Sequence, residues 1–355
     1  MARELNKIPR FNQEDVARHA GVSRATVSAV INSTRYVSPE IQERVREAMA
    51  ALAYEPNAIA RGLKFSRTFT IGLLVPNILS PFWPAVVQGV EDCAREHRYN
   101  VFFYSSNENE EQEMAGLGLF LGRRVDGMLI APAGHSHAEY LARLDSTSMP
   151  VVLLDRRLHG SGLSSVTVDN TRGAYQVVKH LLETGRRRVA VITIPETIST
   201  GHDRVEGYRQ ALADFGLPLE RSLIRTTSFT IEESHAQTLK LFDLPEPPDA
   251  IFATNHSAVI GALQALKHLN KSVPREIAIG GFDDHPWVAL LDPPLTTISQ
   301  PMYALGVEAT ELLITKIESQ GRGHQHSGFP TKPDPKARQN VLETTFVHRK
   351  SCGCA

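Results

Sequence analysis

Polar and aromatic side chains follow several short apolar runs in the middle of the chain, where they could bind a small polar molecule. Asp155 comes directly after an apolar run of four residues, and Asn255 and Asp283 come shortly after two further runs. Carboxylate and amide oxygens can accept hydrogen bonds from the hydroxyl groups of such a molecule. The adjacent aromatics Phe82 and Trp83 could stack on its apolar face, although aromatic residues at such positions are equally typical of an ordinary core.

The first 70 residues carry a positive charge that the rest of the chain lacks. They hold eleven lysines and arginines against seven acidic residues, a net charge of +4. Because the whole chain has a net charge of −1, the remaining residues carry −5. A small basic module on an acidic body is typical of a protein that contacts nucleic-acid phosphates, although charge alone does not exclude ordinary scatter.

Pairs of histidines and cysteines offer the donor atoms that metal ions prefer. These pairs are His135/His137, His324/His326 and Cys352/Cys354. Because they lie in polar loops or at the C-terminal end, we interpret them as solvated loops and a solvated tail, and we expect no metal site.

The sequence indicates neither catalysis nor a bound nucleotide. Residues 116–122 have Gly-x-Gly-x-x-x-Gly spacing, but they lie within a predicted helix and not in the strand-to-helix turn that binds phosphate. The sequence contains no P-loop, and no nucleophile or acid–base pair stands out. We therefore expect no catalytic residue and no cofactor.

The composition is that of a globular protein. Of 355 residues, 42% are hydrophobic and 22% charged, and the length favours two or three domains. No apolar run approaches the ~18–20 residues that a membrane helix needs, and residues 1–10 lack the apolar segment of a secretory signal. Three cysteines are too few for a disulfide framework. We expect a cytoplasmic protein without membrane contact.

Residues 12–52 are predicted to form three short helices. Asn12 can cap a first helix over about 13–20, and Ser23 can cap a second over about 24–31, with a glycine turn between them. Ser38 followed by proline opens a third helix. Two helices joined by a tight turn and closed by a third describe a helix-turn-helix module, whose second helix would enter the DNA major groove.

From residue 69 onward, apolar runs of strand length alternate with helical stretches. The predicted strands are Thr70–Val75, Val101–Tyr104, Gly127–Ala131, Val151–Leu154, Val189–Ile194, Ala250–Ala253 and Ile277–Gly281. The predicted helices are Pro84–His97, Glu111–Arg123, Gly173–Thr184, Arg204–Phe215, Ile231–Phe242 and Ala258–Leu269. This alternation predicts an α/β fold with two similar lobes of parallel sheet flanked by helices. Ligands of such folds bind at the carboxyl ends of the strands, here in the cleft between the lobes.

Residues 15–32, with the sequence DVARHAGVSRATVSAVIN, resemble the signature of the lactose-repressor (LacI/GalR-type) family residue by residue. Residues 54–63 resemble its hinge, and Ile71–Pro76, Arg124–Gly127, Gly280–Asp284 and Pro293–Thr297 resemble motifs of its body. The resemblance covers about residues 11–347. Head, hinge and body motifs together are far more specific than a helix-turn-helix pattern alone.

The resemblance implies a helix-turn-helix DNA-binding domain at 11–55, a hinge at 56–68, a periplasmic-binding-protein-like domain for effector binding and dimerisation at 69–349, and a tail at 350–355. Lobe one of the body would comprise about residues 69–164 and 296–328, and lobe two about residues 165–295 and 329–349. The resemblance also implies a transcription regulator, usually a repressor, that binds a palindromic operator as a homodimer under the control of a small-molecule effector.

The resemblance also assigns DNA contacts. In the major groove it places Arg24, Ala25, Thr26, Ser28, Ala29, Asn32 and Arg35. Arg24 and Arg35 can pair with guanine, whereas Ala25 and Ala29 can offer only methyl contacts. In or beside the minor groove it places the hinge residues Asn57, Ala60, Leu63 and Lys64. Leu63 would be an apolar wedge that unstacks a base step, or else a contact between domains.

Around the effector, the resemblance places Pro76, Asn77, Phe82, Trp83, Asp155, Arg204, Phe229, Asn255, Asp283 and Met302. Carboxylates, an amide, an arginine and aromatics together suit a sugar or sugar acid, and a purine corepressor is the alternative. The chain departs from the family at His256, where aspartate is usual, and this departure alters the effector chemistry or the cap of the next helix.

Two other classes of protein share this α/β body. A sugar-binding transport protein would need an export signal and no basic head, and a sugar-modifying enzyme would need a catalytic pair. Residues 347–355 contain no leucine heptad of the kind by which tetrameric relatives assemble, so we expect a homodimer.

Overall fold

The computed structural model describes residues 11–32, 35–54, 67–134, 140, 143–144, 147, 149–323 and 337–354. The chain divides into two compact units, residues 1–68 and 69–355. Of the hinge predicted at 56–68, only residues 67 and 68 fall within the described part. Within the described ranges, no helix is both long enough and apolar enough to span a membrane.

Three helices form the first unit, the head, as the sequence predicts: α1 (Gln13–Ala20), α2 (Arg24–Asn32) and α3 (Pro39–Ala51). Asn12 caps α1 in a reciprocal capping box with Asp15, each side chain accepting from the other's backbone N–H. Gly21 ends α1 with φ 62°, a left-handed conformation that costs glycine little. The N–H of Thr26 donates to Ser23 Oγ at 3.1 Å, which confirms the predicted cap of α2.

A small apolar core holds these helices together. Its fully buried members are Val16, Ala17, Ala20, Val27, Val45 and Ala48. Arg44 of α3 donates from Nη2 to the carbonyl of Ala20 at 2.5 Å, at the end of α1 where the last carbonyls lack helical partners. Ser38 occupies the N-cap position of α3 without a side-chain cap bond, and Pro39 opens the helix as predicted.

The second unit, the body, contains two six-stranded sheets. The first consists of β1 (Thr70–Val75), β2 (Asn100–Ser105), β3 (Gly127–Ile130), β4 (Val151–Leu154), β5 (Ser164–Val168) and β11 (Gln339–Leu342). The second consists of β6 (Val189–Thr193), β7 (Ile224–Thr226), β8 (Ala250–Ala253), β9 (Ala278–Phe282), β10 (Thr296–Ser299) and β12 (Thr345–Val347). The first sheet has the order β11-β5-β4-β3-β1-β2 and the second the matching order β12-β10-β9-β8-β6-β7. Within the described residues every pairing is parallel except that of β10 with β12.

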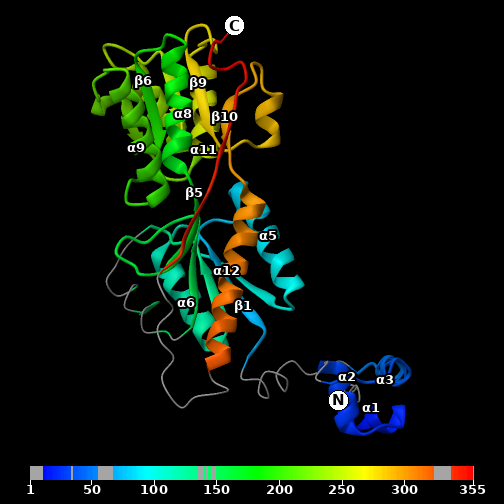
Figure 1. The fold of residues 1–355 in the computed structure, drawn as a ribbon. Coiled ribbons are helices and arrows are strands. Elements are labelled where there is room, and N and C mark those ends of the chain that lie inside the picture. The colour runs from blue at the N-terminus through cyan, green and yellow to red at the C-terminus, as the bar shows by residue number, and fades with distance from the viewer. Residues whose placement is uncertain are drawn as a thin grey trace, which may run out of the picture. The chain divides into compact units, whose positions relative to one another are not determined.

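Helices cover both faces of each sheet, so each sheet and its helices form one lobe (Figure 1). Lobe one has α5 (Phe82–Glu96), α6 (Glu110–Arg123) and α12 (Met302–Gly323). Lobe two has α8 (Asn170–Glu183), α9 (Ser199–Asp214), α10 (Ile231–Phe242) and α11 (His256–His268), with the 3₁₀ turns η1 (Arg221–Leu223) and η2 (Pro286–Leu290). The strands β1, β3, β4, β6 and β8 are buried on both sides, which explains their continuous apolar runs. The predicted two-lobed α/β body is confirmed.

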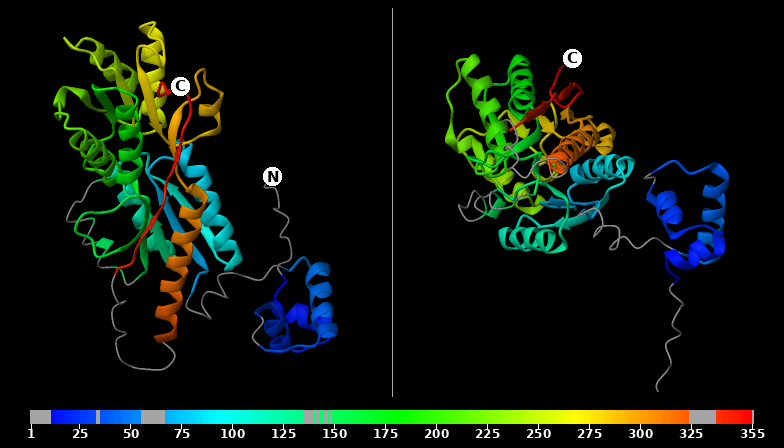
Figure 2. Two further views of the ribbon diagram at one scale, coloured as in Figure 1. Left: turned by 45° about the horizontal axis from the view of Figure 1, so that its top comes forward. Right: turned by 60° about the horizontal axis from the view of Figure 1, so that its bottom comes forward.

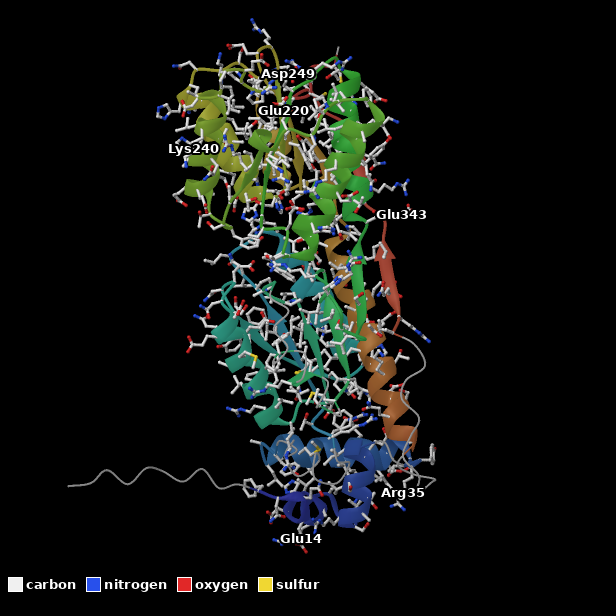
Figure 3. The ribbon with its side chains drawn as sticks, turned by 90° about the vertical axis from the view of Figure 1, so that its left-hand side faces the viewer. Glu14, Arg35, Glu220, Lys240, Asp249 and Glu343 are labelled. Atoms are coloured by element: carbon white, nitrogen blue, oxygen red, sulfur yellow. The ribbon has the colours of Figure 1, made fainter. Side chains whose placement is uncertain are left out.

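The chain crosses between the lobes at three places in the described residues, from β5 to α8, from β10 to α12 and from β11 to β12 (Figure 2). Glu343 lies at the last of these crossings (Figure 3). The lobe boundaries predicted from sequence are wrong at each crossing, because they place residues 165–168 and 339–342 in lobe two and residues 296–299 in lobe one. Each of these strands instead belongs to the sheet of the lobe from which the chain then crosses to the other lobe.

The C-terminal residues are not a solvated tail over 350–355. Ser351 and Cys352 are fully buried in lobe two. Ser351 Oγ donates to the carbonyl of Ile279 at 2.6 Å and accepts from the N–H of Thr296 at 2.8 Å. The segment after β12 is therefore fixed to β9 and β10, and the interpretation of a free tail is wrong for these two residues.

Candidate functional site

A pocket lies between the two lobes at the carboxyl ends of both sheets. Its empty space is about 510 Å³, part of it open to solvent. β1, β4, β6, β8 and β9 all end at this pocket, because the two sheets face each other with the edges at which their parallel strands finish. The fold therefore brings together residues that are far apart in the sequence.

Eight of the ten predicted effector residues line the pocket. They are Asn77, Phe82, Trp83, Asp155, Arg204, Phe229, Asn255 and Asp283. Pro76 and Met302 lie outside this lining, and their contact with an effector stays a prediction. Pro76 is buried and its carbonyl accepts from the N–H of Glu108, while Met302 packs against the core of lobe one.

The aromatic side of the pocket also belongs to the core of lobe one. Phe82 and Trp83 meet edge to face at the start of α5, with ring centroids 5.0 Å apart. Both are buried in the lobe-one core and also line the pocket, so the core interpretation is confirmed and stacking on a ligand stays a prediction. Phe229, from lobe two, lies 5.1 Å from the guanidinium of Arg156 in a cation–π arrangement.

Arg204 of α9 is the cation at the centre of the pocket's charged side. Its Nε donates to Asn170 Oδ1 at 2.8 Å and its Nη1 donates to the carbonyl of Thr254 at 2.5 Å. Burial lowers the pKa of the guanidinium, and the carboxylates of Asp283 and Asp155 act in the opposite direction. The side chain is thus held in a fixed position between the ends of β4 and β9.

Asp155 is a buried carboxylate at the end of β4. Burial raises its pKa to about 6, although the guanidinium groups of Arg156 and Arg204 lower it. Its Oδ1 has no hydrogen-bond partner within the described residues. The backbone of Asp155 also has φ 63°, a left-handed conformation that costs non-glycine residues energy and is often found at functional sites.

Two amide side chains in the pocket also have free polar atoms. Asn255 Oδ1 caps α11 by accepting from the N–H of Ala258 at 2.9 Å, but Asn255 Nδ2 has no partner within the described residues. Gln300, at the crossing from β10 to α12, donates from Nε2 to Asp283 Oδ1. Its own Oε1 has no hydrogen-bond partner within the described residues. With Arg156 Nε, which also has no partner within the described residues, the lining holds two acceptors and two donors that are buried and unused.

Seven further residues line the pocket and escaped the prediction: Ser80, Glu108, Arg156, Ile194, Thr200, His256 and Gln300. Arg156 and Glu108 form a buried bidentate ion pair with both N–O distances at 2.8 Å. His256 Nδ1 lies 3.5 Å from Ser80 Oγ, so these two side chains join the lobes across the pocket. Because Asn255 caps the helix, the departure from the family at His256 leaves the cap intact and puts an imidazole in the pocket wall. The available signals were that Arg156 and His256 each follow a predicted site residue and that His256 departs from the family.

On the head, the predicted DNA residues of α2 differ in exposure. Arg24 and Ala25 are exposed, Thr26 and Ser28 are half-buried, and Ala29 is only 3% exposed. The predicted methyl contact at Ala29 is therefore wrong in this conformation, because a side chain of one carbon is easily covered by its neighbours. Of Asn32 only the backbone, at the end of α2, is described.

Arg35, after the end of α2, is exposed (Figure 3). Its Nη2 lies 3.4 Å from Thr26 Oγ1, and Thr26 Oγ1 is 2.9 Å from Ser23 Oγ. Arg35 is thus placed beside the N-terminal half of α2, on the same side of the head as Thr26. The minor-groove candidates Asn57, Ala60, Leu63 and Lys64 lie outside the described residues.

Two family models match the chain. The model described as "Bacterial regulatory proteins, lacI family" matches residues 13–57. The model described as "Periplasmic binding proteins and sugar binding domain of LacI family" matches residues 68–335. Together they cover the head and most of the body.

Similar proteins match over nearly their whole length. The chain is 34% identical over 301 residues to the Catabolite control protein A of Priestia megaterium, covering 84% of this chain and 90% of that protein. It is 34% identical over 318 residues to the Ribose operon repressor of Halalkalibacterium halodurans, covering 90% and 94%. A solved structure of the transcriptional regulator CelR in complex with cellobiose is 31% identical and superposes with a TM-score of 0.71, covering 96% of this chain and all of that chain.

Proposed function

The chain belongs to the lacI family of bacterial regulatory proteins, and on this premise we propose that it represses transcription by binding a palindromic operator as a homodimer, and that a neutral sugar bound between its lobes changes its affinity for the operator. Such a protein acts where the chromosome lies, which places it in the cytoplasm. The premise also separates it from enzymes and transport proteins that share the α/β body, because the family consists of transcription regulators.

The observation that carries the effector proposal is the set of unused polar atoms in the pocket. Asp155 Oδ1 and Gln300 Oε1 can each accept a hydrogen bond, and Asn255 Nδ2 can donate one. A buried polar atom without a partner costs about 1–3 kcal/mol, so a ligand that supplies the missing partners recovers that energy. Sugar hydroxyls both donate and accept, and the faces of Phe82 and Trp83 suit the apolar side of a pyranose or furanose ring.

The charge of the pocket favours a neutral sugar over a sugar acid or a sugar phosphate. Its lining contains three carboxylates, Glu108, Asp155 and Asp283, and two guanidinium groups, Arg156 and Arg204. Arg156 is paired with Glu108, and the carboxylates of Asp283 and Asp155 act electrostatically on the guanidinium of Arg204. The lining therefore carries one more carboxylate than guanidinium groups, which disfavours an anionic ligand. A relative named for a ribose operon and a neighbour solved with cellobiose support the same class of ligand.

The DNA part of the proposal rests on the head. Its +4 charge, the exposed Arg24 at the start of α2, and Arg35 beside Thr26 form the surface that a second helix-turn-helix helix presents to the major groove. The guanidinium groups can read guanine, while Thr26 and Ser28 can contact phosphate or base edges. We assign minor-groove contact to Leu63 and its neighbours from the sequence resemblance.

A thermal-shift screen tests the effector class. Purified full-length chain is mixed with neutral mono- and disaccharides, sugar phosphates, sugar acids and purine nucleosides, and its melting temperature is recorded. We expect a neutral sugar to raise the melting temperature, because a ligand at 100 times its Kd adds about 2.7 kcal/mol of stability. Stabilisation by purines or sugar phosphates alone would contradict the proposal.

A matched pair of variants links that shift to the pocket. Asn255→Ser keeps an oxygen that can cap α11 but removes the free Nδ2 donor, so it should weaken the sugar response while the protein stays folded. Asn12→Ser makes the same exchange at the cap of α1 in the head and should leave the response unchanged. Equal responses of both variants would show that the sugar binds elsewhere.

A further inference from the structure

Four metal-binding side chains meet on lobe two, away from the pocket between the lobes. They are His180 in the last turn of α8, His348 just after β12, and Cys352 and Cys354 beyond it. One donor atom from each lies within 4.8 Å of the donor atoms of the others. None of the four lines the pocket.

The two sulfurs and two imidazole nitrogens lie close together in pairs. Cys352 Sγ is 3.1 Å from Cys354 Sγ, and Cys354 Sγ is 3.1 Å from His180 Nε2. Cys352 Sγ is 3.5 Å from His348 Nε2, and the two imidazole rings have centroids 4.9 Å apart. The donors thus form a compact group of two nitrogens and two sulfurs.

The backbone around the cluster is fixed by contacts that do not involve the donors. The antiparallel pairing of β12 with β10 positions the segment that carries His348. Arg349 forms a two-pronged ion pair with Asp284, and Ser351 is hydrogen-bonded to β9 and β10. Gly353 has φ 86°, and this left-handed turn brings the thiols on either side of it to the same place.

We propose that His180, His348, Cys352 and Cys354 bind one zinc ion that fastens the C-terminal segment to α8. Two cysteine sulfurs and two histidine nitrogens are a standard ligand set for structural zinc. In a tetrahedral site with Zn–S of about 2.3 Å and Zn–N of about 2.0 Å, neighbouring donors are roughly 3.3–3.8 Å apart. Three of the six donor–donor separations are 3.1–3.5 Å and the others lie within 4.8 Å, so side-chain rotations are needed to complete the tetrahedron.

The position of the site gives it a structural role. The chain enters lobe two at the start of α8 after its first crossing and returns through β12 after its last crossing. A zinc ion at this site ties the second of these segments to the first. The donors come from positions as far apart as His180 and Cys354, and linking distant segments is what stabilises a fold most effectively. We expect the ion to stabilise lobe two without contacting effector or operator.

The zinc content of the full-length chain tests the site. The protein is purified in the presence of a phosphine reductant and without chelator, and its zinc is measured by mass spectrometry and by a chromogenic chelator after denaturation. We expect one zinc ion per chain. Cobalt(II) added to chain stripped of zinc should give the intense visible bands of a tetrahedral site and a sulfur-to-cobalt charge-transfer band.

Substitutions decide whether these four residues hold the ion. Cys354→Ser and His180→Gln should each lose most of the zinc and melt at a lower temperature, and chelator should lower the melting temperature of the unaltered chain but not of these variants. Cys93→Ser in lobe one and His268→Gln at the end of α11 are matched controls that should retain one zinc. The proposal is overturned by a reduced chain that binds no zinc, by full zinc retention in both site variants, or by a Cys352–Cys354 disulfide that persists under the reductant.

Discussion

Replacing Asp155 with asparagine should stabilise the sugar-free protein while weakening its response to sugar. Asp155 is buried at the end of β4, and burial raises the pKa of its carboxyl group from 3.8 to about 6. The folded protein therefore holds this proton more tightly than the unfolded chain does. Below about pH 3.8 the group is protonated in both states and costs nothing. As the pH rises from there to about 6, stability falls, and above that pH the full cost of the buried charge remains.

The size of that cost follows from the shift. The rise in the pKa of Asp155 from 3.8 to about 6 corresponds to a loss of stability of about 3 kcal/mol at neutral pH, since a pKa change of one is worth about 1.4 kcal/mol. Asparagine removes the charge, keeps nearly the same shape and tolerates the left-handed backbone that Asp155 adopts at φ 63°. Asp155→Asn should therefore be more stable than the unaltered chain by up to about 3 kcal/mol at pH 8, a gain of several degrees in melting temperature for a body of this size.

The assay is urea or thermal unfolding of both proteins, without sugar, from pH 4 to pH 8. The difference between them should be small at pH 4 and grow until about pH 6. Asp243→Asn, at an exposed position after α10, is the control for the loss of one carboxylate outside the pocket. A difference that does not change with pH, or a variant less stable than the unaltered chain at pH 8, would refute the reasoning. In the same variant the sugar should bind several-fold more weakly, because hydrogen bonds to a charged acceptor are stronger than bonds to an amide.

Three further outcomes are expected. Arg204→Ala should weaken the response of operator binding to effector at least tenfold while keeping operator affinity, because it removes a cation that Asp155 and Asp283 influence in the pocket. Both quantities are measured by fluorescence anisotropy. An effector midpoint equal to that of the unaltered chain would place the ligand elsewhere. Leu63→Ala should weaken operator binding by at least tenfold and leave sugar binding near normal, because it removes only the apolar side chain proposed to insert into a base step. Unchanged operator affinity would mean that the head binds through the major groove alone. Light scattering at micromolar concentration should show a dimer, and a stable tetramer would contradict the proposed homodimer.

The sequence predicted the parts of the fold whose residues are buried on both sides. Val151–Leu154 and Ala250–Ala253 are predicted and observed with the same bounds, because a strand inside a parallel sheet is uniformly apolar. The same regularity explains the pocket. Asp155, Asn255 and Asp283 could be assigned to one site because the carboxyl ends of parallel strands meet at one edge of a sheet.

Elements without that uniform pattern were missed. β5 has the sequence Ser-Ser-Val-Thr-Val, in which hydroxyl side chains interrupt the apolar run although every residue is buried. β7 and β12 have only three residues each, too few for a periodic pattern. α12 was also missed, although it carries apolar residues at helical spacing and its pattern was therefore available in the sequence. Errors in the lobe boundaries followed from the missing strands.

Pairings between distant residues could not be predicted at all. Glu108 and Arg156 are 48 positions apart, and nothing in the sequence joins them before the loops after β2 and β4 meet at the pocket. His180 is 174 positions from Cys354, so the Cys-Gly-Cys motif looks like a solvated tail until α8 is placed beside it. In both cases the tertiary fold, and not local pattern, selects the partner.

The central claim is that one chain couples a sugar in the body to DNA bound by the head. The most direct measurement is fluorescence anisotropy of the full-length chain on a labelled palindromic DNA selected by this protein from a random pool, with and without the sugar identified by thermal shift. We expect tight binding that weakens steeply with salt, is lost in Arg24→Ala, and shifts by at least fivefold when the sugar is added, a normal allosteric coupling of ~1–3 kcal/mol. Operator affinity that is identical with and without a sugar that demonstrably binds the pocket would contradict it.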